Sequence, residues 1–188
     1  MERSNLILIT GPPGVGKTTL VLKICDELKE KFICRGFVTE EVRSIGKACK
    51  RIGFDVRTLH GERKPLAREC SQNNYTMPKV GKYSVYVKDF EDLVLPLLTQ
   101  PTTKSFLLII DEIGKMELKS KKFEAIVRTL INKVPILATI PSQMSHQIPL
   151  VEHLKSSPST RIFEINKGNR DKVQHDIIKY IDSILKRK

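Results

Sequence analysis

The sequence is poor in aromatic residues, which make up 6 % of it, and it contains no tryptophan. Proteins that bind bases by stacking use exposed aromatic side chains, so no base-reading pocket can be identified from this composition. The sequence also lacks an uninterrupted apolar run of about 18 residues, the length that a membrane-spanning helix needs. No membrane partner is therefore expected.

The first apolar run, Leu6–Ile9, is too short for the apolar part of a secretion signal, and Gly-Pro-Pro follows it closely. No export or transit signal is evident, which favours a cytoplasmic protein, with the nucleus as the alternative. The four cysteines, Cys25, Cys34, Cys49 and Cys70, form no Cys-x-x-Cys pair and no zinc-like spacing with histidine. We expect free thiols in a reducing compartment.

Acidic residues are in the minority: 21 aspartates and glutamates face 33 lysines and arginines, which gives a net charge of +12. Such a balance is typical of nucleic-acid-binding surfaces, but it also suits solvated lysines and a small polyanionic ligand. The charge is spread along the chain, apart from small clusters at Lys119–Lys122 and Lys186–Lys188. No basic block is interleaved with aromatics, so we favour the small polyanion and keep a nucleic acid as the alternative partner.

Apolar strands alternate with amphipathic helices over 188 residues, a length that suits one domain spanning residues 1–188. The patterns predict strands at Asn5–Ile9, Gly36–Val42, Arg51–Leu59, Val80–Val87, Phe106–Ile110, Val134–Ile140 and Arg161–Ile165. They predict helices around Leu20–Leu28, Phe90–Leu97, Phe123–Ile131, 148–155 and Val173–Leu185.

Local signals refine this pattern. Asp89 and Ser120 are candidate helix caps, and a turn around Ser44–Lys47 joins two strands into a hairpin. The polar segment Glu62–Lys79 has the composition of a loop. The expected fold is α/β, with three layers, a mostly parallel central sheet and an antiparallel hairpin insertion near one edge.

The segment Gly11–Thr18, "GPPGVGKT", matches the phosphate-binding P-loop motif in full and lies between a strand and a helix. Its glycines let backbone N–H groups approach phosphate oxygens, and the helix N-terminus adds partial positive charge. Lys17 is expected to reach the β- and γ-phosphates as a catalytic residue, and Thr18 to bind Mg²⁺. The residues expected to bind the nucleotide here are Gly11, Pro12, Pro13, Gly14, Val15, Gly16, Lys17, Thr18 and Thr19.

A pair of acids ends the apolar run of "IIDEIGKMEL". Asp111 is expected to contact, from the outer shell or through water, the Mg²⁺ ion that Thr18 holds. Glu112 is the expected catalytic carboxylate: if the strand ends between the two acids, it is free to hold a water in line with the γ-phosphate. The alternative is that Glu112 caps the next helix or pairs with Lys115. Ile113 and Gly114, in the same turn, are counted with the nucleotide-binding residues.

Lys115 follows Gly114 where the chain leaves the sheet, and it is a candidate for stabilising transition-state charge or a solvated loop lysine. Thr139 ends the next buried strand, where it either senses the γ-phosphate or is a hydrogen-bonded strand end. Arg170 is a candidate for stacking on the base, unless it simply begins the last helix. Arg43 and Arg51 flank the hairpin turn as arginine-finger candidates, with surface ion pairs as the alternative.

Several stretches occur here in an order that resembles one family: "TGPPGVGKTTL", "GFVTEEVR", "RIGFDV", "VGKYSVYV", "IIDEIGKMEL", "ATIP" and the Asn169–Arg170 pair. Together they are similar to the cancer-related nucleoside-triphosphatase family, over most of the chain. The resemblance implies a RecA/AAA-like core and slow, Mg²⁺-dependent hydrolysis of ATP, GTP, CTP and UTP with little base preference. Only Glu62–Lys79 has no clear counterpart.

The sequence therefore predicts a monomeric, Mg²⁺-dependent nucleoside-triphosphate phosphatase. One alternative is a nucleotide or polynucleotide kinase, for which "GERKPLARE", Gly61–Glu69, is the candidate lid. The other is a nucleic-acid-stimulated ATPase or switch, which the net charge of +12 favours.

Overall fold

A single mixed sheet of nine strands, in the order β5-β6-β4-β3-β2-β7-β8-β1-β9, organises the molecule. It is seen in a computed structural model that describes residues 5–46, 49–69, 76–100, 106–142 and 148–186. The strands are β1 (Leu6–Thr10), β2 (Ile33–Arg43), β3 (Arg51–Thr58), β4 (Arg63–Glu69), β5 (Lys79–Val80), β6 (Tyr83–Val85), β7 (Phe106–Asp111), β8 (Ile136–Thr139) and β9 (Thr160–Glu164).

Strands β2, β7, β8, β1 and β9 run parallel, whereas β3, β4, β6 and β5 extend the sheet in antiparallel pairs. The helices are α1 (Lys17–Leu28), α2 (Val87–Thr99), α3 (Lys121–Leu130), α4 (Pro149–Ser156) and α5 (Arg170–Leu185), and Glu117–Lys119 form a 3₁₀ turn, η1. The expected α/β class, with an antiparallel hairpin of β2 and β3 beside a parallel sheet, is confirmed.

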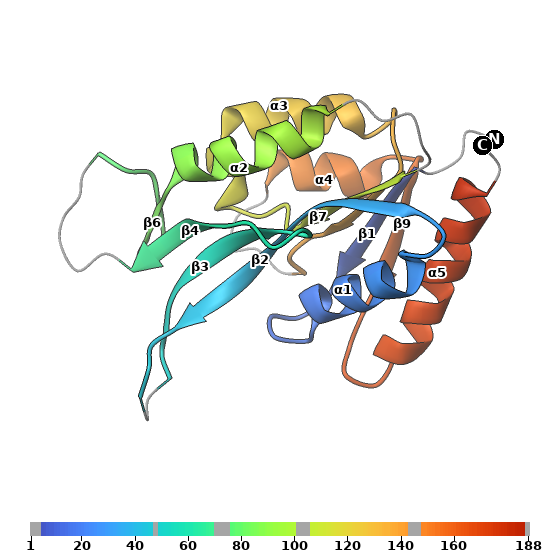
Figure 1. The fold of residues 1–188 in the computed structure, drawn as a ribbon, viewed down its shortest axis with the longest axis horizontal. Helices are drawn as coiled ribbons and strands as arrows, with labels where there is room; N and C mark the ends of the chain where they lie inside the picture. Colours follow the sequence, from blue (N-terminus) through green and yellow to red (C-terminus); the bar gives the residue numbers. More distant parts are fainter. Residues whose placement is uncertain (1–4, 47–48, 70–75, 101–105, 143–147, 187–188) are drawn as a thin grey trace.

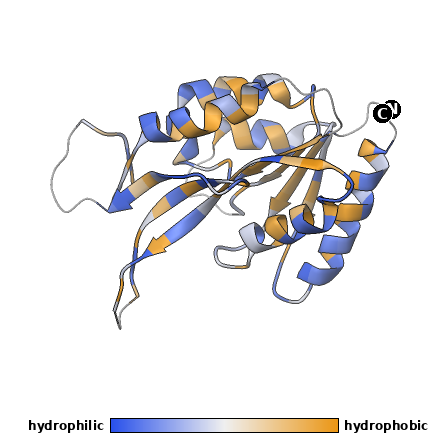
Figure 2. Ribbon diagram, viewed as in Figure 1, coloured by the Kyte–Doolittle hydropathy of each residue, from blue (hydrophilic) through white to orange (hydrophobic). Residues whose placement is uncertain are grey.

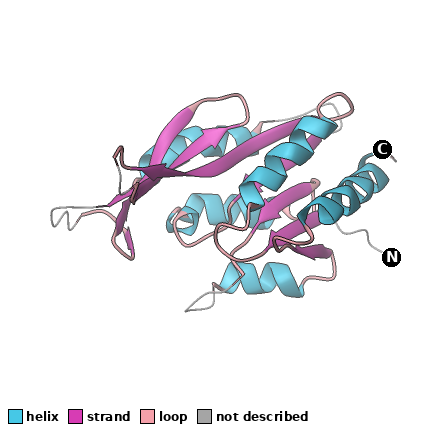
Figure 3. Cartoon of the chain, turned by 90° about the horizontal axis from the view of Figure 1, so that it is seen from below, coloured by secondary structure: helices cyan, strands magenta, loops and turns pink. Residues whose placement is uncertain are grey.

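Helices cover both faces of the sheet. Figure 1 shows α2, α3 and α4 on one face and α1 and α5 on the other, and Figure 3 shows the helices and the sheet from below. Apolar strand residues fill both interfaces, and Figure 2 shows the apolar strands between the two helix layers. On the α2–α3 face, Phe37, Phe90 and Phe123 meet edge to face, with ring centroids 5.2–5.9 Å apart. Alternation along each strand therefore decides which helix layer a side chain meets.

The polar segment that resembles a loop contains a strand, β4, so the expectation of a loop at Glu62–Lys79 is wrong over residues 63–69. Leu66 and Ala67 are fully buried, and the strand pairs with β3. Pro65 is accommodated where the register shifts, which is a position that tolerates proline. Burial and cross-strand ion pairs, which composition does not reveal, stabilise this strand.

Smaller differences concern the ends of elements. The expected strand Val80–Val87 is a tight hairpin of β5 and β6, because Gly81 has a φ of 56°. Helix α2 begins at Val87, so Asp89 lies in its first turn and is not the cap. Ser120 does cap α3, and its hydroxyl oxygen accepts a hydrogen bond from the Phe123 N–H at 3.0 Å.

Cys25, Cys34 and Cys49 are free thiols, as expected, and Cys70 lies outside the described residues. Within the described ranges, no helix is long and apolar enough to cross a membrane.

Candidate active site

The P-loop connects β1 to α1 and turns tightly before the helix. Gly14 and Gly16 have φ values of 71° and 99°, conformations in which a side chain would be strained. Gly16 directly precedes the first helical residue, Lys17, whose Nζ donates to the Gly11 carbonyl at 3.1 Å. The ammonium group thus lies back over the loop, where it can meet phosphate oxygens. Pro12, Pro13 and Thr19 are exposed around the loop, and Val15 is buried beneath it.

Arg170, the first residue of α5, contacts the P-loop from the C-terminal part of the chain. Its Nη1 donates to the Val15 carbonyl at 3.1 Å. It also lies so close to Gly16 that a Cβ there would be 2.8 Å from Nη1. The arginine begins the last helix, which was one of its two interpretations, and it supports the loop backbone. Stacking on a base stays a prediction for this side chain.

Asp111 is the last residue of β7 and is 2 % exposed. Its Oδ1 accepts a hydrogen bond from the hydroxyl of Thr139, at the end of the neighbouring β8. Burial raises the pKa of the Asp111 carboxyl, whereas the Thr139 and Thr18 hydroxyls and the Lys17 ammonium favour the ionised form. Its Oδ2 is buried and has no hydrogen-bond partner among the described residues.

This oxygen marks where a cation fits. A buried carboxylate oxygen without a donor is costly unless a positive charge satisfies it. The Thr18 hydroxyl lowers the pKa of the same carboxyl group, and its oxygen would be a second ligand for the cation. Carboxylate and hydroxyl oxygens are hard ligands that suit a divalent cation of the Mg²⁺ type.

Glu112 follows the end of β7, so the strand ends between the paired acids, as predicted. Strand alternation therefore does not force the two side chains apart. Burial raises the pKa of Glu112, while the nearby Lys17 lowers it and Asp111 raises it. Glu112 caps neither following helical segment, because Met116 precedes η1 and Ser120 precedes α3. The helix-capping alternative is thus excluded.

A third carboxylate, Glu117, lies beside these acids, and no sequence motif singles it out. It is 4 % exposed. Its Oε2 accepts from the Gly114 N–H at 3.1 Å, and its Oε1 from the Thr39 hydroxyl on β2 at 3.3 Å. Burial, with repulsion from Glu112, raises the pKa of Glu117 to about 8. In the sequence, Glu117 lies between two apolar residues, Met116 and Leu118, and this is its only signal.

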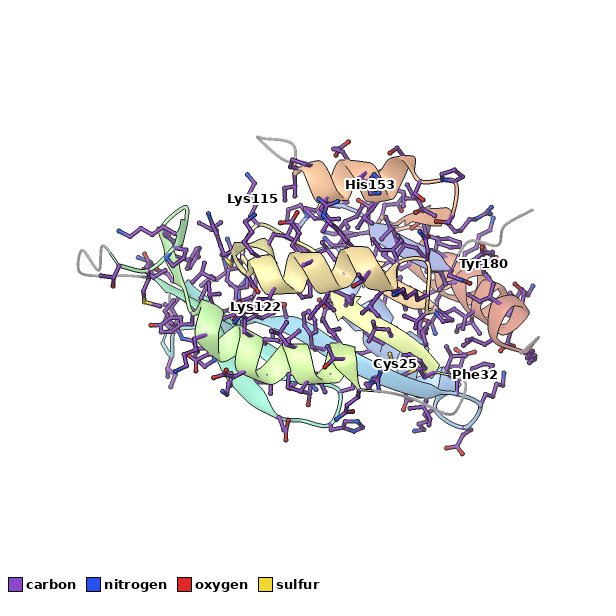
Figure 4. All side chains as sticks on the ribbon, turned by 90° about the horizontal axis from the view of Figure 1, so that it is seen from above. Cys25, Phe32, Lys115, Lys122, His153 and Tyr180 are labelled. Atoms are coloured by element: carbon purple, nitrogen blue, oxygen red, sulfur yellow. The ribbon has the colours of Figure 1, made fainter. Side chains whose placement is uncertain are left out.

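The turn between Glu112 and Glu117 is held by backbone contacts. The Ile113 N–H donates to the Thr139 carbonyl at 2.9 Å, and Ile113 is fully buried. Gly114 is buried too. Lys115 is half-buried and projects from the segment that leads into α3 (Figure 4). Its role in charge stabilisation stays a prediction.

The two arginine-finger candidates lie on the hairpin and share one acid, Glu41. Arg43 and Arg51 pair with its carboxylate at 2.6 and 2.9 Å. Glu41 is opposite Phe54, which packs with the α2–α3 layer. The pair therefore lies on the sheet face away from α1 and the P-loop.

A second arginine pair occupies the opposite face. Val38 is opposite both Asp111 and Arg57, and Arg57 is opposite Arg63, so these residues form one row across four strands. Paired residues share a face, and Val38 packs with α1. Arg57 contacts Glu40 at 2.7 Å, and Arg63 binds the other oxygen of Glu40. Two arginines thus lie in register with Asp111, on the P-loop side.

Comparisons with known proteins find relatives over nearly the whole chain. A family model described as NTPase matches residues 6–178. The mouse cancer-related nucleoside-triphosphatase homolog is 39 % identical over 189 residues, which cover 96 % of this chain and 98 % of the mouse protein. Nucleoside-triphosphatase THEP1 of Aquifex aeolicus is 41 % identical over 184 residues, 94 % of this chain and 98 % of that protein.

Two solved structures have the same fold. The crystal structure of THEP1 from Aquifex aeolicus superposes with a TM-score of 0.79 at 39 % identity, over 96 % of this chain and 99 % of the other. The solution structure of a human cancer-related nucleoside triphosphatase also has a TM-score of 0.79, at 38 % identity over 95 % and 97 % of the two chains.

Proposed function

The chain belongs to the nucleoside-triphosphatase family whose model it matches over residues 6–178, and we propose that it hydrolyses ATP, GTP, CTP and UTP to the diphosphate and phosphate in a Mg²⁺-dependent reaction. Membership of this family identifies the chain as a nucleoside-triphosphate hydrolase. The observation that carries the proposal concerns the buried Asp111. Its Oδ2 has no hydrogen-bond partner in the described part of the chain, and Thr18 and Lys17 both favour the ionised form of its carboxyl group.

The phosphates are bound by the loop. Backbone N–H groups around Gly14 and Gly16 and the N-terminus of α1 attract phosphate oxygens. Lys17 exchanges its contact with the Gly11 carbonyl for the β- and γ-phosphates. Thr18 and Asp111 would hold Mg²⁺, which when bound neutralises charge on the phosphate oxygens.

Glu112 orients the attacking water. Phosphoryl transfer depends mainly on positioning and on charge stabilisation, so a carboxylate beside the γ-phosphate has the water as its task. A raised pKa makes Glu112 a better proton acceptor near neutral pH than an ordinary glutamate. Arg57 and Arg63 supply positive charge on the same face as the loop. Low base selectivity fits a chain without tryptophan.

The test is phosphate release from each of the four triphosphates, with and without Mg²⁺, by the wild type and by Glu112→Gln. We expect similar rates for all four nucleotides, a requirement for Mg²⁺, and a loss of at least about 100-fold in kcat for the variant. The variant should bind ATP as well as the wild type does. Near-normal turnover by Glu112→Gln would refute the role of this residue.

The same assay separates the alternative functions. A kinase transfers the phosphate to an added nucleotide or polynucleotide acceptor and forms a phosphorylated product. A nucleic-acid-stimulated ATPase turns over faster with DNA or RNA, and the stimulation falls steeply with salt. We expect neither a phosphorylated acceptor nor faster turnover with DNA or RNA.

A further inference from the structure

The carboxyl groups of Glu117 and Glu112 both lie close to the place that a side chain at residue 114 would occupy. A Cβ added to Gly114 would lie 2.8 Å from Glu117 Oε2 and 2.9 Å from Glu112 Oε1. Because residue 114 is a glycine, the buried carboxyl group and the proposed catalytic carboxylate can both approach this space. A shift in the position of Glu117 would therefore change the surroundings of the Glu112 carboxylate.

The contacts of Glu117 connect three parts of the site. The Gly114 N–H donates to one oxygen, so the turn after β7 is fixed at its third residue. The Thr39 hydroxyl binds the other oxygen, and Thr39 lies on β2, next to β7 in the sheet. Thr39 also follows Val38, the residue that is opposite Asp111. The strand that borders the metal-side acid therefore holds the turn that carries Glu112.

From this geometry we propose that Glu117 is a positioning residue for hydrolysis: its bonds to Gly114 and Thr39 hold the turn in which Glu112 presents its carboxylate to water. The inference rests on the proposed role of Glu112 and adds a second residue to it. Glu117 does not touch the substrate in this scheme, and it acts through the backbone at residues 112–114.

The chemistry of the position supports a function beyond stability. An acid buried beside two others is unfavourable for folding, and an apolar side chain of similar size would avoid that cost. An apolar residue would leave the buried Gly114 N–H without an acceptor and would free the turn to move. A carboxyl group, or an amide of the same shape, has the two polar atoms that both partners need.

The experiment compares Glu117→Ala, Glu117→Gln and Thr39→Val. Glutamine keeps both contacts, because its carbonyl accepts from Gly114 and its amide donates to Thr39. Alanine removes both contacts, and Thr39→Val removes one of them with little change in shape. For each variant we measure kcat, KM, the Kd of a fluorescent ATP analogue and the Tm.

Glu91→Ala is the matched control. Glu91 is also a carboxylate that accepts a hydroxyl bond near α3, from Ser120 at 2.8 Å, and it pairs with Lys122 at 2.9 Å. It has no contact with the Gly114 turn among the described residues. The control therefore shows how much kcat changes when a comparable local contact is lost.

We expect Glu117→Ala to lower kcat by at least about 10-fold with KM and Kd within about 2-fold, because only the water-positioning carboxylate is displaced. Glu117→Gln should stay within about 3-fold of the wild type, and Thr39→Val should fall between the two. Glu91→Ala should keep a normal kcat.

Unchanged kcat in Glu117→Ala overturns the inference, and so does a loss that appears equally in KM and Kd. If Glu117→Ala does not fold, the other two variants decide: a normal kcat for Thr39→Val, or a loss in Glu117→Gln equal to that of Glu112→Gln, refutes positioning. Glu112→Gln is measured in parallel. Full activity of that variant refutes the proposed role of Glu112, on which this inference rests, and absence of phosphate release by the wild type refutes the proposed function itself. Inactivity of Glu112→Gln beside a fully active Glu117→Ala refutes only the role of Glu117.

Discussion

The Thr139 hydroxyl donates a hydrogen bond to Asp111 Oδ1, across the ends of two neighbouring parallel strands. Both side chains are buried, at 0 % and 2 % exposure. This bond fixes one carboxylate oxygen and leaves Oδ2 for another partner. Thr139 thus fixes the orientation of the Asp111 carboxylate, the proposed metal ligand.

Replacing Thr139 by valine should weaken the use of Mg²⁺. Losing a hydrogen bond to a charged group costs about 1.5–3 kcal/mol, which corresponds to about 10-fold or more in an equilibrium constant. We expect the Mg²⁺ concentration for half-maximal phosphate release to rise by about this factor. Thr139→Ser keeps the hydroxyl and should behave like the wild type; an unchanged Mg²⁺ titration for Thr139→Val would contradict the role.

The raised pKa of Glu117 predicts a pH-dependent stability. The folded state retains a proton up to about pH 8 that the unfolded chain releases near 4.5. The contribution of Glu117 to the free energy of unfolding is thus complete below about pH 4.5, and it is lost as the pH rises toward 8. The free energy of unfolding of the wild type, relative to Glu117→Gln, should fall by up to about 1.4 kcal/mol per pH unit in this window.

Urea unfolding of the two proteins from pH 5 to 9, in metal-free buffer, measures this difference. Asp111 and Glu112 are present in both proteins, so their own titrations largely cancel. A difference that is constant across the range would show that Glu117 titrates normally.

The two arginine pairs should differ in their effect on catalysis. Arg57→Ala/Arg63→Ala removes the charges that lie on the P-loop face, in one row with Asp111. We expect kcat to fall by at least about 10-fold, since arginine charge stabilises the phosphoryl-transfer transition state. The single variants then identify which of the two arginines carries the effect.

Arg43→Ala/Arg51→Ala is the matched control, because these arginines also share one glutamate but lie on the opposite face. Its kcat should stay within about 2-fold of the wild type. Equal losses in the two double variants would mean that net charge, and not placement, matters.

Arg170→Ala should loosen the P-loop. The variant loses the bond to the Val15 carbonyl, so we expect KM to rise several-fold, about equally for all four triphosphates. An effect confined to purine nucleotides would instead indicate stacking on the base. Arg161→Ala is the control. Arg161 lies on the edge strand β9, and its guanidinium contacts the rings of Phe163 and Tyr180 instead of the P-loop.

Much of the site is predictable from local patterns. The P-loop at Gly11–Thr18 needs a strand, a set of glycines and a helix start that are contiguous in the chain. Asp111 is found because a wholly apolar run ends in an acid, and Ser120 because capping is a local interaction. These features depend on neighbours in sequence, so the residues alone specify them.

The remaining features depend on residues far apart in the sequence. Strand β4 forms because Arg63 and Arg68 meet Asp55 and because Leu66 is buried, and neither is visible in a polar segment. Arg43 and Arg57 are both arginines in strand-like segments. Only the register of the strands shows that they lie on opposite faces of the sheet.

The local motifs of the sequence therefore predict that the chain binds a triphosphate and that a pair of acids lies near it. The packing of β2 against β7 decides the rest. It places Thr39 against Glu117 and Val38 opposite Asp111, because alternation sends successive residues of one strand to opposite faces of the sheet. Strand β2 thus meets Asp111 on one face of the sheet and, through Glu117, the turn that carries Glu112 on the other.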